Sequence, residues 1–98
     1  MSSHHDSPYR VSHDDHAMTL TDADAPVGRL DWRLESGIVY VDYVHVDPAR
    51  RGHGLGARLV DAAADYARQT GRRLVPLCGF ARRVLHGDPR YQDLLADD

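Results

Sequence analysis

The chain has 98 residues, 42% hydrophobic and 28% charged, which fits one folded domain and excludes a disordered chain or a second domain. The formal net charge is −3, but most arginines lie after residue 49, so the first half is acidic and the second basic. The weak overall charge argues against duplex nucleic acid as the main partner, while the basic half suits a polyanionic small molecule. The single cysteine excludes an internal disulfide and a cysteine-based zinc cluster.

The N-terminal segment is polar and without periodicity. We expect residues 1–8 to be a disordered tail and residues 9–98 to be the folded domain. No apolar run approaches the roughly 20 residues of a membrane helix, so we expect a cytoplasmic protein with no membrane partner. His13–His16 contains possible metal ligands, but a site needs three or four that converge. We interpret this run as a turn and expect no metal.

Alternating residues at 17–21 and 26–33, separated by a turn at 22–25, predict a β-hairpin. Ser36-Gly37 then breaks the pattern. Residues 38–46 are dense in β-branched and aromatic side chains and predict the central strand, which ends at Asp47-Pro48 because proline cannot donate to a ladder.

Apolar residues spaced by three and four predict a helix from Leu55 to Thr70, ended by Gly71. A short buried strand at 74–77, a short helix at 79–86 and a last helical piece ending near Leu95 follow. The strand, helix and strand between residues 38 and 77 predict a parallel βαβ unit. The fold class is therefore mixed α/β, with Trp32, Tyr40, Leu59 and Phe80 in the core and Tyr91 docking the C-terminal segment.

Arg51-Gly52-His53-Gly54-Leu55-Gly56 lies between the central strand and the long helix. Glycines let backbone N–H groups approach a ligand, and the first turn of a helix leaves N–H donors unpaired, so the loop predicts an anion site. A nucleotide P-loop is excluded because the chain has no lysine. The dinucleotide fingerprint fits poorly, because it opens a larger domain directly after its first strand.

The run Val46-Asp47-Pro48-Ala49-Arg50-Arg51-Gly52-His53-Gly54-Leu55-Gly56 resembles motif A of the GNAT superfamily of N-acetyltransferases. Val75-Pro76-Leu77-Cys78 and the later Pro89-Arg90-Tyr91 resemble the small single-domain branch marked by Pro-Leu-Cys. The resemblance covers about residues 16–95. It implies a twisted, mainly antiparallel sheet with a central parallel βαβ unit and flanking helices, and a domain that binds acetyl-coenzyme A (acetyl-CoA).

The resemblance also implies a set of cofactor-binding residues. Val44 and Val46 would offer backbone groups to the pantetheine arm, and Arg51 with the N–H groups of Gly52, His53, Gly54, Leu55 and Gly56 would hold the pyrophosphate. The His53 side chain itself is interpreted as exposed. Arg82 and Arg83 could reach the ribose 3′-phosphate, although a solvated face is the simpler interpretation.

Two residues are candidates for catalysis. His45 is a histidine, the residue type most often used as a general base, lies where the superfamily often places its base, and shares a strand face with Tyr43. Cys78 follows the short strand, whose end we expect near the end of the central strand, and precedes a helix that would favour its thiolate. We therefore expect an N-acetyltransferase that acetylates a primary amine of a small molecule or protein, directly or through acetyl-Cys78. The alternative is a non-catalytic acyl-CoA-binding or partner-interaction module on the same fold.

Overall fold

The computed structural model describes residues 8–96. This span contains five strands, two α-helices and two short 3-10 helices. In chain order they are β1 (Tyr9–His13), β2 (Ala17–Asp22), β3 (Ala25–Glu35), β4 (Ile38–Val46), η1 (Pro48–Arg50), α1 (Leu55–Gln69), β5 (Arg73–Pro76), α2 (Gly79–His86) and η2 (Pro89–Tyr91).

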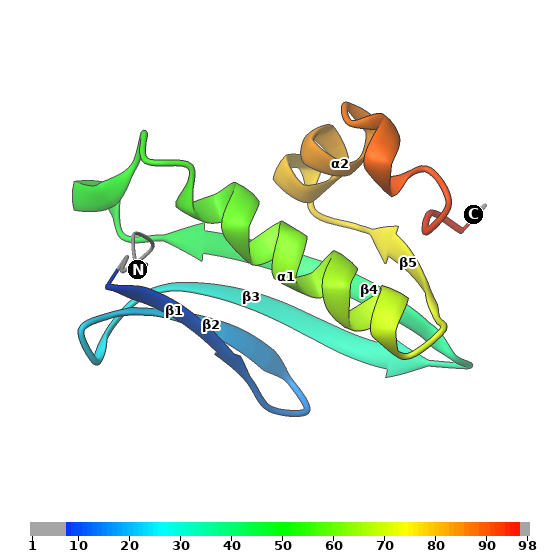
Figure 1. The fold of residues 1–98 in the computed structure, drawn as a ribbon, viewed down its shortest axis with the longest axis horizontal. Helices are drawn as coiled ribbons and strands as arrows, with labels where there is room; N and C mark the ends of the chain where they lie inside the picture. Colours follow the sequence, from blue (N-terminus) through cyan, green and yellow to red (C-terminus); the bar gives the residue numbers. More distant parts are fainter. Residues whose placement is uncertain (1–7, 97–98) are drawn as a thin grey trace, which may run out of the picture.

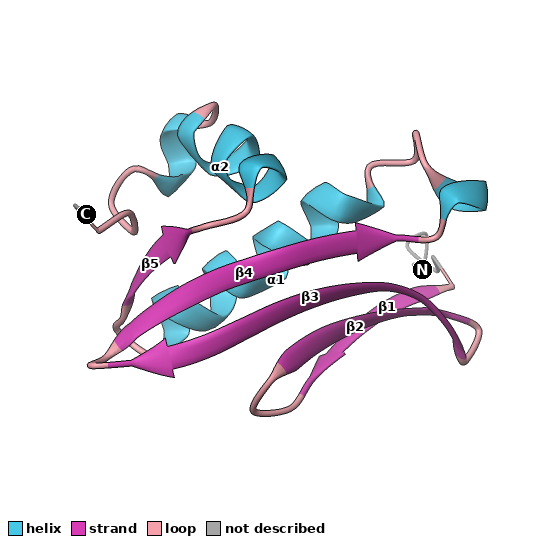
Figure 2. Cartoon of the chain, turned by 180° about the vertical axis from the view of Figure 1, so that it is seen from behind, coloured by secondary structure: helices cyan, strands magenta, loops and turns pink. Residues whose placement is uncertain are grey.

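The five strands form one sheet in the order β1-β2-β3-β4-β5. Strands β1 to β4 pair with one another in antiparallel order. Strand β5 follows the crossover through α1 and runs parallel to β4. Both α-helices cover the same face of this sheet (Figure 1), and the view from behind shows the strands in front of α1 (Figure 2). The expected α/β fold with its parallel βαβ unit is confirmed, and that unit lies at the β5 edge of the sheet.

Strand β1 was not predicted from the sequence. Its side chains are exposed or half-buried, so they carry no strong apolar alternation. Pairing of all five of its residues with β2, from Tyr9 opposite Asp22 to His13 opposite Met18, defines it instead. Between the two strands the Asp14 carboxylate accepts the N–H groups of His16 and Ala17 at 2.8 and 2.9 Å. The turn therefore lies at residues 14–16, with His13 at the end of β1. Residues 8–96 hold no group of three possible metal ligands.

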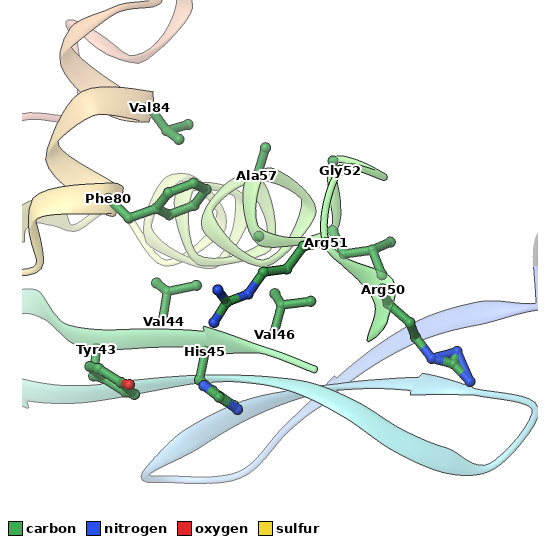
Figure 3. A pocket seen from close by; sticks show the side chains of 13 residues that line it. Tyr43, Val44, His45, Val46, Arg50, Arg51, Gly52, Ala57, Phe80 and Val84 are labelled. Carbon is green, nitrogen blue, oxygen red and sulfur yellow. The ribbon is translucent and has the colours of Figure 1, made fainter. Parts of the chain in front are cut away.

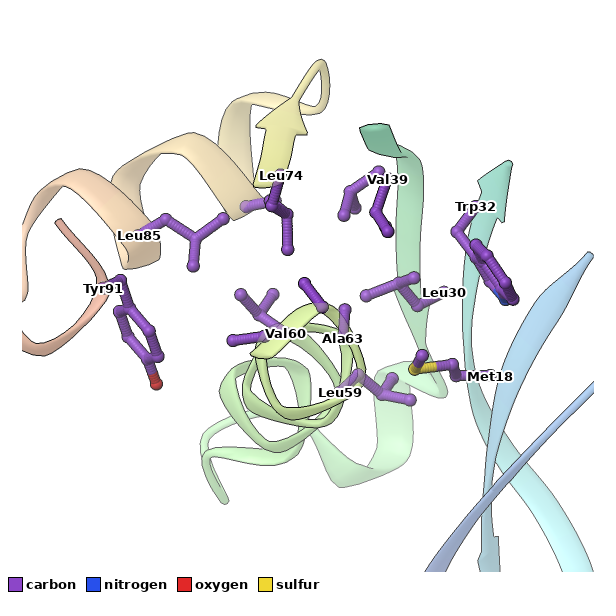
Figure 4. Packing of buried hydrophobic residues seen from close by; sticks show 14 of the residues in the cluster. Met18, Leu30, Trp32, Val39, Leu59, Val60, Ala63, Leu74, Leu85 and Tyr91 are labelled. Carbon is purple, nitrogen blue, oxygen red and sulfur yellow. The ribbon is translucent and has the colours of Figure 1, made fainter. Parts of the chain in front are cut away.

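The core lies between the sheet and α1 (Figure 4). Trp32 and Leu59 belong to it, as predicted, and Leu59 is fully buried. Tyr40 was predicted there wrongly: it is half-buried on the other face of the sheet, where the Arg33 guanidinium lies 4.7 Å from its ring centre. Phe80 is only half-buried and packs at the margin of the core.

Tyr91 docks the C-terminal segment on α1, as expected. Its side chain is buried, and its hydroxyl donates a hydrogen bond to Asp61 Oδ1 at 2.8 Å. Burial, together with this bond, raises the pKa of Tyr91 to about 12. The N–H of Leu74 also donates to Leu94, and the N–H of Ala96 to Leu74, so the C-terminal residues pair with the outer edge of β5.

A β-bulge interrupts the alternation of β4. Val41 is opposite Trp32 and Tyr43 is opposite Asp31, so Asp42 has no partner residue on β3. Before the bulge the odd-numbered Val39 and Val41 face the core. After it the even-numbered Val44 and Val46 pack against the core. The bulge therefore reverses which residues of β4 face α1.

The expected disordered tail lies mostly outside the described residues, since residues 1–7 are not among them. Pro8 belongs to the folded part, because its carbonyl accepts the N–H of Ala23 at 3.2 Å. Within residues 8–96, neither helix has the length and apolar character that a membrane crossing requires.

Candidate functional site

A cavity of about 560 Å³ lies where β4, the loop after it, α1 and α2 meet (Figure 3). Val44 and Val46 form its floor, and Phe80 and Val84 face them from α2. The lining is completed by Tyr43, His45, Arg50, Arg51, Gly52, Gly54, Leu55, Gly56 and Ala57. Most predicted cofactor-binding residues therefore share one cavity.

The edge of β4 beside this cavity has no partner strand within residues 8–96. Strand β5 pairs with residues 38–41 of β4. The N–H groups of Leu77 and Cys78, which follow β5, both donate hydrogen bonds to the carbonyl of Val41, at 2.9 and 3.3 Å. Beyond that point the chain turns into α2. At the far end of β4, Asp47 donates its N–H to Val27 of β3 at 2.8 Å.

Backbone groups of successive strand residues point to alternate sides. Since the N–H of Asp47 points toward β3, the N–H and C=O groups of Val46 and Val44 point the other way, toward the open edge. An extended ligand could pair with them as an added strand does. The sequence-based expectation for these two valines is consistent with this geometry.

The loop at residues 52–54 presents N–H donors that have no hydrogen-bond partner within the described part of the chain. Gly52 and Gly54 have φ values of 88° and 73°, in the left-handed region that glycine adopts without strain. Gly54 is the N-cap of α1 and supplies no side-chain cap, and the first bond into the helix runs from Arg58 N–H to the Gly54 carbonyl at 3.1 Å. Within residues 8–96, no hydrogen bond is donated by the backbone N–H groups of residues 52–57.

The charges around the cavity favour an anion. Arg51 is exposed, and its side chain extends between the loop and the two floor valines (Figure 3). Arg50, its neighbour, extends away from the cavity floor and forms an ion pair with Asp22 at 2.8 Å. Among the described residues, no carboxylate side chain lines the cavity. A helix N-terminus, free N–H groups and a guanidinium thus converge on one place, as phosphate binding requires.

His45 and Tyr43 lie together, as predicted. Their rings are stacked, 6.3 Å apart and inclined by 9°, and both residues are exposed. Figure 3 shows the two side chains on the opposite side of β4 from Val44 and Val46. Thus His45 borders the cavity with its backbone while its imidazole faces the uncovered side of the sheet. His53 is exposed and does not line the cavity.

Cys78 lies outside the cavity lining. It is half-buried against the core and is the N-cap residue of α2. The sequence predicted it near the end of β4, but its N–H bonds to Val41, five residues before that end. The bulge at Asp42 separates Cys78 from His45 along the strand, so the structure does not unite the two catalytic candidates in one cavity. Arg82 and Arg83 are exposed on α2.

The sequence did not indicate that Phe80 and Val84 line the site. The signal was present in their spacing of four residues, which places both on one face of α2. Gly56 shows why Phe80 comes so close: a Cβ added there would lie 2.8 Å from Phe80 Cζ. The absence of a side chain at Gly56 therefore allows α2 to close the cavity over the start of α1.

The family model for the GCN5-related N-acetyl-transferase matches residues 16–94. A GCN5-like protein from Staphylococcus aureus has the same fold, with a TM-score of 0.74 and 20% identity over 94% of this chain and 92% of that one. A GNAT family acetyltransferase from Brucella melitensis, in complex with acetyl-CoA, has a TM-score of 0.58 and 26% identity over 68% and 49%.

A ribosomal-protein-S18-alanine N-acetyltransferase from Escherichia coli also shares the fold, with a TM-score of 0.64 and 16% identity, over 78% of this chain and 53% of that one. No curated protein matches the sequence. The family match covers most of the chain, including the central strand, the glycine loop and the short helix that surround the cavity. The chain therefore belongs to the family of GCN5-related N-acetyltransferases.

Proposed function

We propose that this protein binds acetyl-CoA in the cavity and transfers the acetyl group to a primary amine of a small molecule or protein. One observation carries the proposal: in the described part of the chain, a strand edge without a partner strand and a cluster of N–H donors without hydrogen-bond partners border the same cavity. Those two features suit the two chemical halves of coenzyme A, an amide-containing arm and a diphosphate. The Brucella melitensis relative in complex with acetyl-CoA supports it.

Each predicted cofactor-binding residue has a role in this proposal. Val44 and Val46 bind the amide-containing arm through their backbones. Arg51 and the N–H groups of residues 52–56 bind the diphosphate, and His53 contributes its backbone only. The apolar faces of Phe80 and Val84 exclude water from the arm. Acetyl-CoA supplies the activated thioester.

A lysine-like amine has a pKa near 10.4 in water, so the acceptor must lose a proton before it attacks. We propose His45 as the group that accepts this proton, directly or through one water, from the uncovered side of the sheet. Its exposure and its stacking on Tyr43 support that role, because they leave the imidazole accessible to an acceptor on that side.

Direct attack of the amine on the thioester is the favoured route. In the alternative, the Cys78 thiolate attacks the thioester carbonyl, coenzyme A leaves as its thiol, and the amine then displaces the acetyl group from sulfur. The position of Cys78 outside the cavity lining supports the direct route. Intact-protein mass spectrometry after acetyl-CoA treatment tests it: an acetyl adduct that disappears in Cys78→Ala would establish the covalent route.

A non-catalytic acyl-CoA-binding or partner-interaction module is the second candidate. It is favoured by the lack of any carboxylate among the described side chains that line the cavity, since a carboxylate is a common base. Calorimetric titration with coenzyme A tests the step that both candidates share. Acetyl transfer to a panel of polyamines, amino acids and basic peptides then separates them, because a module binds without turnover. Failure to bind coenzyme A would refute the enzyme and the acyl-CoA-binding module, and would leave the partner-interaction module.

A further inference from the structure

The adjacent residues Arg50 and Arg51, at the start of the glycine loop, direct their side chains to different places. Figure 3 shows the Arg51 side chain at the cavity and the Arg50 side chain directed toward the β2–β3 hairpin. Arg50 Nη1 lies 2.8 Å from Asp22 Oδ2, and the two side chains are only 32% and 25% exposed. In every other ion pair among the described residues, at least one side chain is more exposed than either Arg50 or Asp22.

We propose that the ion pair between Arg50 and Asp22, here called the Arg50–Asp22 clamp, positions the glycine loop for its ligand. Arg50 is thus a positioning residue and not an anion ligand. The clamp itself is a property of the fold. Its effect on coenzyme A rests on the proposed function.

Asp22 is a firm anchor for such a clamp. It is the last residue of β2 and pairs with β1 on one side, opposite Tyr9, and with β3 on the other, opposite Ala25. The three strands hold its backbone in place. The turn that follows is also tightly defined, with Ala23 and Asp24 both at positive φ. A side chain bound to Asp22 is therefore bound to the sheet.

The segment before the loop is held at both ends. At its start the N–H of Asp47 is bound to Val27, and the Asp47 carboxylate accepts the N–H of Ala49 at 3.0 Å, which closes η1. At its end Arg50 reaches Asp22 across 28 residues of sequence. The Arg50 Nε is buried, has no hydrogen-bond partner among residues 8–96, and lies 4.0 Å from Asp47 Oδ2. The guanidinium is thus held between two carboxylates.

Beyond Arg50 the chain has few restraints of its own. The N–H of Arg51 makes one long bond of 3.4 Å to Pro48, and the N–H groups from Gly52 to Gly54 make none among the described residues. The clamp is therefore the last fixed point before the N–H groups face the cavity. Fixing that point reduces the number of loop conformations, and a loop ordered in advance loses less entropy when it binds.

The first test needs no ligand. In the full chain labelled with ¹⁵N, relaxation order parameters of Gly52 and Gly54 should fall in Asp22→Asn and in Arg50→Gln. Asp24→Asn is the matched control, because it removes the same charge from the same turn without touching Arg50, and it should leave both order parameters unchanged. If Asp22→Asn leaves both order parameters at the wild-type value, the clamp is refuted.

The second test is calorimetric titration with coenzyme A. Asp22→Asn and Arg50→Gln should each weaken binding about fivefold, and the double variant should be no weaker than either single one. The charge exchange Asp22→Arg with Arg50→Asp should restore part of the loss. If Arg50→Gln weakens binding while Asp22→Asn does not, Arg50 contacts the ligand directly and the clamp is wrong. If the wild type does not bind coenzyme A, the cofactor proposal fails, and the order parameters alone decide the clamp.

Discussion

Replacing Gly54 by alanine tests the glycine loop without introducing a clash. Gly54 has a φ of 73°, and a Cβ added there would meet nothing within 4 Å. The whole cost of Gly54→Ala therefore comes from holding an L-residue in the left-handed region, about 1–2 kcal/mol. The loop can escape this strain by leaving its conformation, because the N–H groups of residues 52–54 have no hydrogen-bond partner among the described residues. That escape removes the donors from the cavity.

If the bound loop must keep this strained conformation, the binding free energy is weakened by the same roughly 1–2 kcal/mol. The affinity for coenzyme A then falls about 5- to 30-fold, since each 1.4 kcal/mol is a factor of ten. Calorimetric titration measures this change. Gly54→Asn should lose less, because asparagine adopts the left-handed region more readily. Gly71→Ala is the matched control: Gly71 has a φ of 68° and equally open space around it, but it follows the far end of α1.

Gly71→Ala should lower the melting temperature and leave the affinity for coenzyme A unchanged. The reasoning is refuted if folded Gly54→Ala binds as tightly as the wild type. It is also refuted if Gly71→Ala weakens binding to the same extent, because the effect would then be general destabilisation.

Three further outcomes are expected. Leu59→Ala should reduce the free energy of unfolding in urea by about 2–5 kcal/mol, because Leu59 is fully buried and its loss leaves a cavity; a smaller loss would mean that α1 packs less closely than described. The pKa of Tyr91 is raised from 10.0 to about 12, so the stability from its protonated hydroxyl is complete below about pH 10 and is lost as the pH rises toward 12. Urea denaturation at about pH 9 and about pH 11 should show this loss in the wild type and not in Tyr91→Phe. Arg51→Gln should weaken coenzyme A binding and make it less sensitive to salt, because one charged contact is removed; an unchanged salt dependence would remove Arg51 from the diphosphate site.

The elements with strong local signals could be predicted from the sequence. The long helix has an apolar stripe and a terminal glycine, and the glycine loop has its own chemistry, so both were located close to their observed bounds. Strand β1 was missed because its residues are largely exposed and pairing with β2 defines it. An edge strand of this kind depends on tertiary contacts that local patterns do not contain.

The candidate site was predicted less completely. The glycines and Arg51 could be predicted as an anion site because a glycine-rich loop before a helix is recognisable in the sequence alone. The predicted position of Tyr40 was wrong because both the odd-numbered and the even-numbered residues from Ile38 to Val46 are largely apolar or aromatic. The sequence pattern therefore does not show which set faces the core, nor where the bulge at Asp42 exchanges the two sets. Phe80 was assigned to the core, while its role in the cavity depends on how α2 approaches Gly56. Such contacts between distant segments are set by packing.

The unpaired residue in β4 has a consequence for how this protein tolerates changes in chain length. Deleting Asp42 would restore regular pairing with β3 without turning the rest of the strand, because Val41, which faces the core, would then be followed directly by Tyr43, which faces away from it. A residue inserted in β3 between Asp31 and Trp32 would instead give Asp42 a partner. Regular alternation would then turn Tyr43 and His45 toward α1 and the N–H and C=O groups of Val44 and Val46 toward β3. The site should therefore tolerate the loss of one residue from β4 at Asp42, whereas one residue gained in β3 opposite it would remove the strand edge that borders the cavity.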